Sequence, residues 1–142
     1  MHTIALIIGA ALAAGDAGGA GVRDLPVGWR VLDGDTVEAP APAAPDGPLL
    51  HWRLRGYDTP EAGGRAKCEA ERAAAERATL LLDALIRSAQ RVELRTETAQ
   101  CMWGRPCATL VIDGVPAAQL LIGAGLARPM GPREKRRSWC AP

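Results

Sequence analysis

The chain has 142 residues, of which 48% are apolar and 23% are charged, which fits a single globular domain with its own hydrophobic core. The formal net charge is only +1, so the protein as a whole is not a polycation that holds nucleic acid by counterion release alone. Any nucleic-acid contact must therefore be local. Aromatic residues make up 4% of the chain, which disfavours extended stacking of bases but allows a single stack.

The first 20 residues have the pattern of a secretory signal. An apolar run, Thr3–Ala14, is followed by small residues, and Ala11-Leu12-Ala13 matches an A-x-A cleavage site. The run is short for a membrane span, and no basic residue precedes it. We expect a signal peptide over residues 1–20, with export of the mature domain, residues 21–142, to the periplasm or the medium. The alternative is a buried first strand or helix followed by a flexible connector, Gly15–Gly21.

The number of cysteines supports export. The chain has four, Cys68, Cys101, Cys107 and Cys140, and an even number is typical of a disulfide-bonded protein in an oxidising compartment. Three pairings are possible, and the sequence alone does not choose between them. A zinc site is the competing interpretation, but no C-x-x-C pair occurs, which disfavours it.

Short strands dominate the first half of the chain. An Asp-Gly pair between apolar runs favours a tight hairpin, and a Pro-rich stretch is not a central strand. The predicted elements are a hairpin over 28–38 turning at Asp33-Gly34, a Pro/Ala-rich loop over 39–48, and a strand over 49–57 that Asp58–Glu61 interrupts.

A long amphipathic helix follows over Arg65–Arg87, with Ala70, Ala74, Ala78, Leu81, Leu82 and Leu85 on its apolar face. The remaining predicted elements are strands over 91–96 and 108–112, a turn over 103–106, a second Asp-Gly hairpin at 113–114, a short helix over 117–124 ended by Gly125, and an irregular tail over 128–142. We therefore expect an α+β, mainly β domain: an OB-fold, that is, a five-stranded Greek-key barrel with two to three covering helices.

Two aspartates are candidate metal ligands. Asp35 and Asp58 supply the hard oxygen atoms that Ca²⁺ or Mg²⁺ prefers, and they meet only if the strands beside them pair. Taken singly, each has a simpler explanation: Asp35 belongs to a hairpin turn, and Thr59 and Glu61 flank a proline in the way that precedes many helices.

Two arginines are candidate phosphate-binding residues and strengthen the hypothesis of a functional site here. A guanidinium binds phosphate through two parallel hydrogen-bond donors and stays charged. Arg53 lies five residues before Asp58, so both side chains reach one site only if the strand bends, and Gly56 is the obvious place. Arg105 would arrive from a second hairpin. Its simpler explanation is an exposed turn residue.

Taken together and in order, these motifs resemble the signature of the staphylococcal nuclease (thermonuclease) family. The matching stretches are Val31–Val37 (VLDGDTV), Arg53–Glu61 (RLRGYDTPE) and Trp103–Arg105 (WGR), with Leu126-Ala127 after a short helix. The resemblance covers about residues 28–128, with a long helix between the second and third motifs.

The resemblance implies a metal-dependent nuclease that hydrolyses phosphodiester bonds of DNA and RNA and leaves 3′-phosphates. Asp35 and Asp58 would bind one Ca²⁺ ion through their carboxylates and Thr59 through its backbone carbonyl. Glu61 would act on the attacking water, and Arg53 and Arg105 would stabilise the pentacoordinate transition state. We expect a monomer that makes no membrane contact after signal removal. The alternatives are an inactive OB-fold module that only binds nucleic acid, and an exported structural domain.

The chain departs from the family pattern in three places. Cys101-Met102 replaces an acidic and a basic residue before the aromatic-Gly-Arg turn, and Trp103 replaces the usual tyrosine. The link Ala62–Gly64 is short, and no tyrosines follow the last helix, so base preference is not carried over. On the fold that the resemblance implies, we expect Cys101 to pair with Cys107 around the turn of Arg105, and Cys68 to pair with Cys140. The basic run Arg133–Arg137 would be either a solvated tail or a contact for the nucleic-acid backbone.

Overall fold

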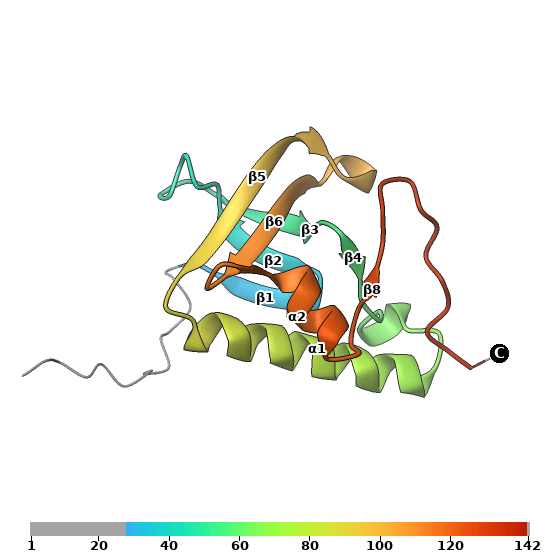
Figure 1. The fold of residues 1–142 in the computed structure, drawn as a ribbon. Coiled ribbons are helices and arrows are strands. Elements are labelled where there is room, and N and C mark those ends of the chain that lie inside the picture. The colour runs from blue at the N-terminus through green and yellow to red at the C-terminus, as the bar shows by residue number, and fades with distance from the viewer. Residues whose placement is uncertain (1–27, 142) are drawn as a thin grey trace, which may run out of the picture.

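The structure is a computed structural model that describes residues 28–141, so the signal peptide predicted over residues 1–20 lies outside the described residues. Its elements are a sheet of several strands, two α-helices and two short 3₁₀ turns (Figure 1). In chain order they are β1 (Arg30–Asp33), β2 (Thr36–Pro40), β3 (Leu49–Leu54), β4 (Tyr57–Asp58), η1 (Gly63–Arg65), α1 (Glu69–Ser88), β5 (Val92–Gln100), η2 (Met102–Gly104), β6 (Pro106–Ile112), β7 (Val115–Pro116), α2 (Ala117–Gly123) and β8 (Arg128–Pro129).

The main sheet has the strand order β1-β2-β3-β6-β5, with β7 added to β6. Neighbouring strands within this sheet pair antiparallel, except that β3 and β6 pair parallel. The predicted α+β class is confirmed. Within residues 28–141 no ladder joins β1 to β5, so the hydrogen-bonded sheet is open and does not form the closed barrel that we expected from the sequence.

The helix α1 runs along one side of the sheet, and α2 packs between α1 and β6 (Figure 1). The core lies between these layers. It is formed by buried apolar residues of strands and helices alike, among them Val37, Trp52, Leu54, Leu82, Ile86, Leu110 and Leu121. Among the described residues, no helix is both long and apolar enough to cross a bilayer.

The helix α1 begins at Glu69, four residues later than predicted. Cys68 is its N-cap: the backbone there is extended, and the sulfur accepts a hydrogen bond from the Glu71 amide. The buried line of the helix is also rotated from the predicted face, because Glu71 is buried and Ala70 is exposed. The buried residues are Glu71, Ala75, Ala78, Leu82 and Ile86.

Two glycines shape the turns that matter for the site. A Cβ on Gly34 would lie 2.8 Å from the Ala78 Cβ and from the Thr59 Cγ2, so only glycine lets the first hairpin turn lie this close to α1. Gly56 has φ +90°, a backbone conformation that L-residues rarely adopt, and it separates β3 from β4. The predicted bend after Arg53 is therefore confirmed.

Two expectations about the loops need correction. The Pro-rich loop begins at residue 41, because Ala39 and Pro40 extend β2 and pair with Leu50 and Leu49 at the end of the β2–β3 ladder. The C-terminal tail is not irregular from its start. Residues 128 and 129 form β8, which pairs with β4 in a separate two-stranded sheet, whereas from residue 130 to 141 there is no helix or strand.

Both expected disulfides are present: Cys68 pairs with Cys140 and Cys101 pairs with Cys107. None of the four cysteines is free, so no cysteine thiolate among them is available to a zinc ion. The first bridge spans 72 residues and ties the tail to the start of α1, whereas the second spans only 6 residues and closes the turn before β6.

Removing the two bridges is expected to have unequal costs. In the chain-entropy model a longer closed loop restricts the unfolded chain more, so Cys68→Ser/Cys140→Ser should lower the free energy of unfolding by about 4 kcal/mol and Cys101→Ser/Cys107→Ser by about 2 kcal/mol. Serine at position 68 keeps an N-cap acceptor, which makes the comparison fair. Urea denaturation of both variants measures the difference. An equal or reversed cost would contradict this account of the bridges.

Candidate functional site

The candidate site lies where the first hairpin turn meets the end of β3. In the β2–β3 ladder Thr36 pairs with Arg53, so Asp35, one residue earlier, lies beside the last residues of β3. The Leu54 amide donates to the Asp35 carbonyl at 2.8 Å and continues this contact. The bend at Gly56 then brings β4, with Asp58, back toward the same point.

Arg53 joins the two aspartates. Its Nη2 lies 3.2 Å from Asp35 Oδ2 and 3.8 Å from Asp58 Oδ1. Its guanidinium also donates to three backbone carbonyls, those of Leu54 at 2.5 Å, Tyr57 at 3.0 Å and Asp35 at 3.4 Å. With 14% of its side chain exposed, Arg53 is held in one orientation by the fold itself.

Asp35 is a buried carboxyl whose pKa is shifted by its surroundings. Burial raises its pKa, the Arg53 guanidinium opposes that rise, and the neighbouring Asp33 adds to it. The Thr59 amide donates to Asp35 Oδ2 at 3.3 Å, and the Thr36 hydroxyl donates to Oδ1 at 3.1 Å. These donors partly compensate a charge that the fold has removed from water, and a nearby cation would complete the compensation.

Glu61 lies between two further arginines. Its Oε2 is 3.0 Å from Arg65 Nε, and its Oε1 forms an ion pair with Arg136 Nη1. Arg65 also reaches Asp33 Oδ2 at 3.4 Å, which connects Glu61 to the first hairpin. Glu61 is therefore part of the same network of charges as Asp35 and Asp58.

Arg136, from the C-terminal tail, contacts three of the residues that the sequence assigned to the site. Its Nε donates to Asp58 Oδ1 at 2.7 Å, its Nη2 donates to the Thr59 carbonyl at 2.7 Å, and its Nη1 pairs with Glu61. Nearby, the Trp139 indole donates to Asp58 Oδ2 at 3.2 Å, and the Arg128 guanidinium lies 3.7 Å from the centre of the Trp139 ring. The tail runs down the side of the molecule on which β4 lies (Figure 1).

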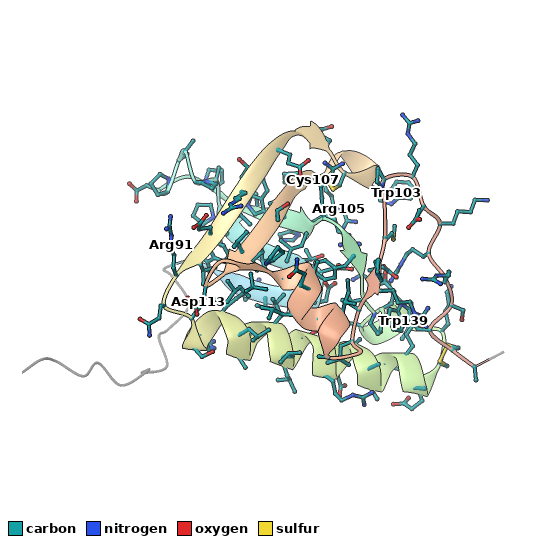
Figure 2. All side chains as sticks on the ribbon, viewed as in Figure 1. Arg91, Trp103, Arg105, Cys107, Asp113 and Trp139 are labelled. Atoms are coloured by element: carbon teal, nitrogen blue, oxygen red, sulfur yellow. A yellow bond between two sulfur atoms is a disulfide. The ribbon has the colours of Figure 1, made fainter. Side chains whose placement is uncertain are left out.

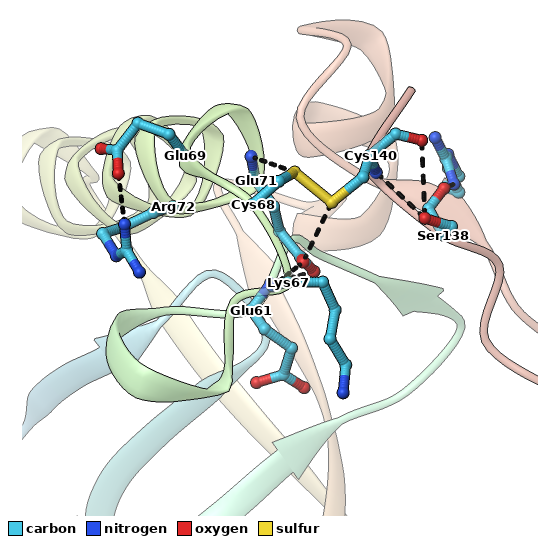
Figure 3. Close-up of a disulfide and its surroundings, with 9 residues drawn as sticks. Glu61, Lys67, Cys68, Glu69, Glu71, Arg72, Ser138 and Cys140 are labelled. Carbon is cyan, nitrogen blue, oxygen red and sulfur yellow. Dashed lines mark hydrogen bonds and ion pairs between the residues drawn. A yellow bond between two sulfur atoms is a disulfide. The ribbon is translucent and has the colours of Figure 1, made fainter. Parts of the chain in front are cut away.

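Glu71 supports the loop that carries Glu61. Its carboxylate is 4% exposed and accepts hydrogen bonds from the backbone amides of Glu61 at 3.1 Å and Lys67 at 2.7 Å (Figure 3). A carboxylate in the first turn of a helix is also stabilised by the helix dipole. Glu71 Oε2 lies 3.8 Å from the Cys140 sulfur. Although Cys68, Glu71 and Cys140 converge, the two sulfur atoms are bonded to each other, so the group is not a thiolate metal site.

Arg105 differs from the other five predicted residues in its contacts. It follows the turn of Trp103, whose side chain is 88% exposed and whose backbone has φ +67° (Figure 2). The β3–β6 ladder pairs Arg53 with Cys107, so strand alternation puts Arg105, two residues earlier, on the same face as Arg53. Its buried Nε has no hydrogen-bond partner among residues 28–141.

The structure thus brings together Asp35, Arg53, Asp58, Thr59 and Glu61, and leaves Arg105 without a polar side-chain contact to them in the described part of the chain. Sequence reasoning missed the site roles of Arg136, Trp139, Arg65 and Glu71. The sequence did hold a signal for Arg136 and Trp139. A bridge between Cys68 and Cys140 holds residues 136–139 close to the start of α1, and Glu61 lies in the loop that leads into that helix.

Comparison with known proteins adds no relative: no family model matches the chain, and no curated protein matches its sequence.

Tyr57 stabilises the turn that carries Asp35, and we expect its removal to be measurable. Its hydroxyl donates to the Gly34 carbonyl at 2.7 Å, so Tyr57→Phe should lower the free energy of unfolding at pH 7 by about 1–2 kcal/mol. Burial, and next the negative charge of Asp35, raise the pKa of Tyr57 well above its usual value of about 10. Above that pH the unfolded chain loses a proton that the folded protein keeps, so wild-type stability should fall as the pH rises.

Urea denaturation between pH 8 and pH 11 measures both effects. Tyr57 is the single tyrosine of the chain, so Tyr57→Phe removes the tyrosine contribution while leaving the lysines unchanged. The two proteins should therefore converge in stability as the pH rises. A constant difference across this range would show that Tyr57 titrates normally.

Proposed function

We propose that this protein is a metal-dependent nuclease of the staphylococcal nuclease type, which hydrolyses phosphodiester bonds of DNA, RNA or both with one Ca²⁺ ion. The observation that carries the proposal is the position of Arg53, whose Nη2 lies within 3.2 Å of Asp35 and 3.8 Å of Asp58. A carboxylate from the first hairpin turn, a carboxylate from β4 and a guanidinium from β3 converge there, and Thr59 and Glu61 lie beside them. These are the residue types that the cleavage of a phosphodiester needs at one point.

The donor set fits a hard cation. The carboxylates of Asp35 and Asp58 and the Thr59 carbonyl are oxygen donors of the kind that Ca²⁺ prefers. The same oxygen atoms already attract positive charge in this structure, because Arg136 contacts both Asp58 Oδ1 and the Thr59 carbonyl. When bound, Ca²⁺ would supply charge that polarises the phosphate and lowers the pKa of a bound water.

Arg53 would stabilise charge in the transition state, and Glu61 would act on the attacking water. Arg53 is fixed by three backbone carbonyls, so it can stabilise a developing negative charge without first reorganising. Glu61, with 24% of its side chain exposed, is accessible to water and can orient a water molecule or take its proton. For this step Glu61 must be free of its contact with Arg136.

Arg105 supports the proposal in a different way. A buried donor without an acceptor is costly, and the Nε of Arg105 is such a donor among the described residues. A phosphate oxygen of the substrate would satisfy it. The bridge between Cys101 and Cys107 closes the turn around Arg105 and would limit its movement.

The strand order is consistent with an OB-fold. We propose that β1, β2, β3, β5 and β6 correspond to the five strands of that Greek-key barrel, because the helix α1 separates the third strand from the fourth and β3 runs parallel to β6. We also propose that the protein acts as a monomer outside the cytoplasm, in the periplasm or the medium. The two disulfides are compatible with export.

The second candidate is an OB-fold module that binds nucleic acid without cleaving it. The contacts of Arg136 favour it, because they occupy Asp58 and Glu61, and among residues 28–141 the Nε of Arg105 has no hydrogen-bond partner. Such a module would bind single-stranded oligonucleotides with or without Ca²⁺ and leave them intact.

Cleavage of DNA and RNA by the mature protein, with Ca²⁺ and then with a chelator, separates the two candidates. We expect cleavage that requires Ca²⁺ and that falls about 100-fold or more in Arg53→Lys and in Glu61→Gln. Lysine keeps the charge of Arg53 but lacks its fork of donors. Arg53→Ala and Arg105→Ala should likewise lose most activity without unfolding the protein.

The matched control is Arg55→Lys. Arg55 is two residues from Arg53 on the same stretch of chain, but its side chain pairs with Glu97. It should retain full activity. Binding of the nucleic acid without any Ca²⁺-dependent cleavage would replace the nuclease with the binding module.

A further inference from the structure

The C-terminal tail segment, residues 130–141, occupies the acidic end of the candidate site. Three of its contacts are made by one guanidinium, that of Arg136, to Asp58, the Thr59 carbonyl and Glu61. A fourth is the hydrogen bond from the Trp139 indole to the other oxygen of Asp58. A solvated tail, one of the two expectations from the sequence, does not describe this arrangement.

The contacts of Arg136 overlap with the groups that the proposed function assigns to metal and water. Asp58 and the Thr59 carbonyl are two of the three proposed metal ligands, and Glu61 is the residue proposed to act on water. A monovalent guanidinium therefore lies where a divalent cation is needed. The two compete, because the 2.7 Å hydrogen bonds to Asp58 Oδ1 and the Thr59 carbonyl place a second positive charge beside the oxygen atoms that the ion would need.

We propose that the tail segment is a tethered plug, and that Arg136 and a divalent cation compete for the oxygen atoms of Asp58 and Thr59. The inference rests on the metal site of the proposed function and adds a resident competitor to it. With Arg136 in place, two of the three metal ligands and Glu61 are occupied together. Entry of the cation takes the two ligands and releases Glu61.

The disulfide keeps the competitor close. Cys140 is bonded to Cys68, just before α1, and Arg136 lies only four residues before Cys140 (Figure 3). Four residues span at most about 14 Å, so a displaced Arg136 stays near the site. Tethering at this range raises the effective concentration of a group into the millimolar range or above. The stacking of Arg128 on Trp139 adds a second attachment.

The contacts of Arg136 are also weak enough to yield. Its side chain is 33% exposed, against 14% for Arg53, so water screens its ion pairs more strongly. A divalent ion carries twice the charge and can take several oxygen atoms at once. The exchange therefore removes Arg136 and leaves Arg53, which backbone carbonyls hold in place.

Calorimetric titration with Ca²⁺ alone, without nucleic acid, tests the competition. We expect Arg136→Gln to bind Ca²⁺ about tenfold more tightly than the wild type, because a binding site freed from a competitor regains its intrinsic affinity. Cys68→Ser/Cys140→Ser keeps every charge but releases the tether, and it should also bind Ca²⁺ more tightly. The matched control is Arg137→Gln, since Arg137 is exposed and makes no hydrogen bond or ion pair with residues 28–141. Its affinity should equal that of the wild type.

Hydrogen exchange gives a second result that does not depend on activity. Adding Ca²⁺ to the wild type should speed amide exchange across residues 131–139, and it should not do so in Arg136→Gln. Unchanged exchange in the wild type at saturating Ca²⁺ would overturn the plug.

The outcomes separate this inference from the proposed function. Equal Ca²⁺ affinity in the wild type and Arg136→Gln, together with lost binding in Asp58→Asn, would overturn the plug and keep the metal site. An equal gain in Arg136→Gln and Arg137→Gln would reduce the effect to net charge and would also overturn the plug. No Ca²⁺ binding in any variant, Arg136→Gln included, would overturn the plug and the metal of the proposed function together.

Discussion

The ion pair between Arg53 and the two aspartates is the interaction on which this end of the molecule depends. Burying a carboxylate is costly unless a charge or several hydrogen bonds compensate it, and the pKa of Asp35 is raised by burial even with Arg53 beside it. Arg53 can serve both carboxylates because the hairpin turn lies against the end of β3 and the chain bends at Gly56. The close approach of Gly34 to α1 and the hydrogen bond from Tyr57 to its carbonyl maintain that geometry.

Two arginines contact Asp58 in different ways. Arg53 comes from a central strand of the sheet and is fixed by backbone carbonyls. Arg136 comes from a segment without helix or strand, is more exposed, and depends on the bridge between Cys68 and Cys140 for its place. The first arrangement suits a group that must be ready for an incoming phosphate, and the second suits a group that can be replaced. The bridge also keeps the segment that carries Arg136 close to Asp58.

Local signals in the sequence were sufficient for most of the fold. Asp-Gly pairs located both hairpins, alternating apolar residues located the strands, and the Ala/Leu-rich stretch located α1. The predicted buried face of α1 was wrong because the polar Glu71 is buried. Its carboxylate accepts hydrogen bonds from the amides of Glu61 and Lys67. An argument from apolar periodicity does not anticipate a buried carboxylate. The predicted closure of the sheet into a barrel was also wrong for the hydrogen-bonded sheet of residues 28–141. Pairing between β1 and β5 depends on tertiary packing, which local sequence signals do not report.

The candidate site could be predicted only as far as its residues belong to ordered motifs. Asp35, Arg53 and Asp58 each stand in a turn or at the end of a strand, where residue type indicates position. Arg136 stands in a basic run that resembles a solvated tail, and its contact with Asp58 crosses 78 residues of sequence. Such a contact follows from the disulfide and not from any local pattern.

A crystal structure of the mature protein grown with Ca²⁺ would test the central claim most directly. The account predicts one ion bound by the carboxylates of Asp35 and Asp58 and by the Thr59 carbonyl, at about 2.3–2.6 Å, with Arg53 still paired to Asp35 and the Arg136 guanidinium withdrawn. An ion-free acidic cluster that is still bridged by Arg136 at saturating Ca²⁺ would contradict it.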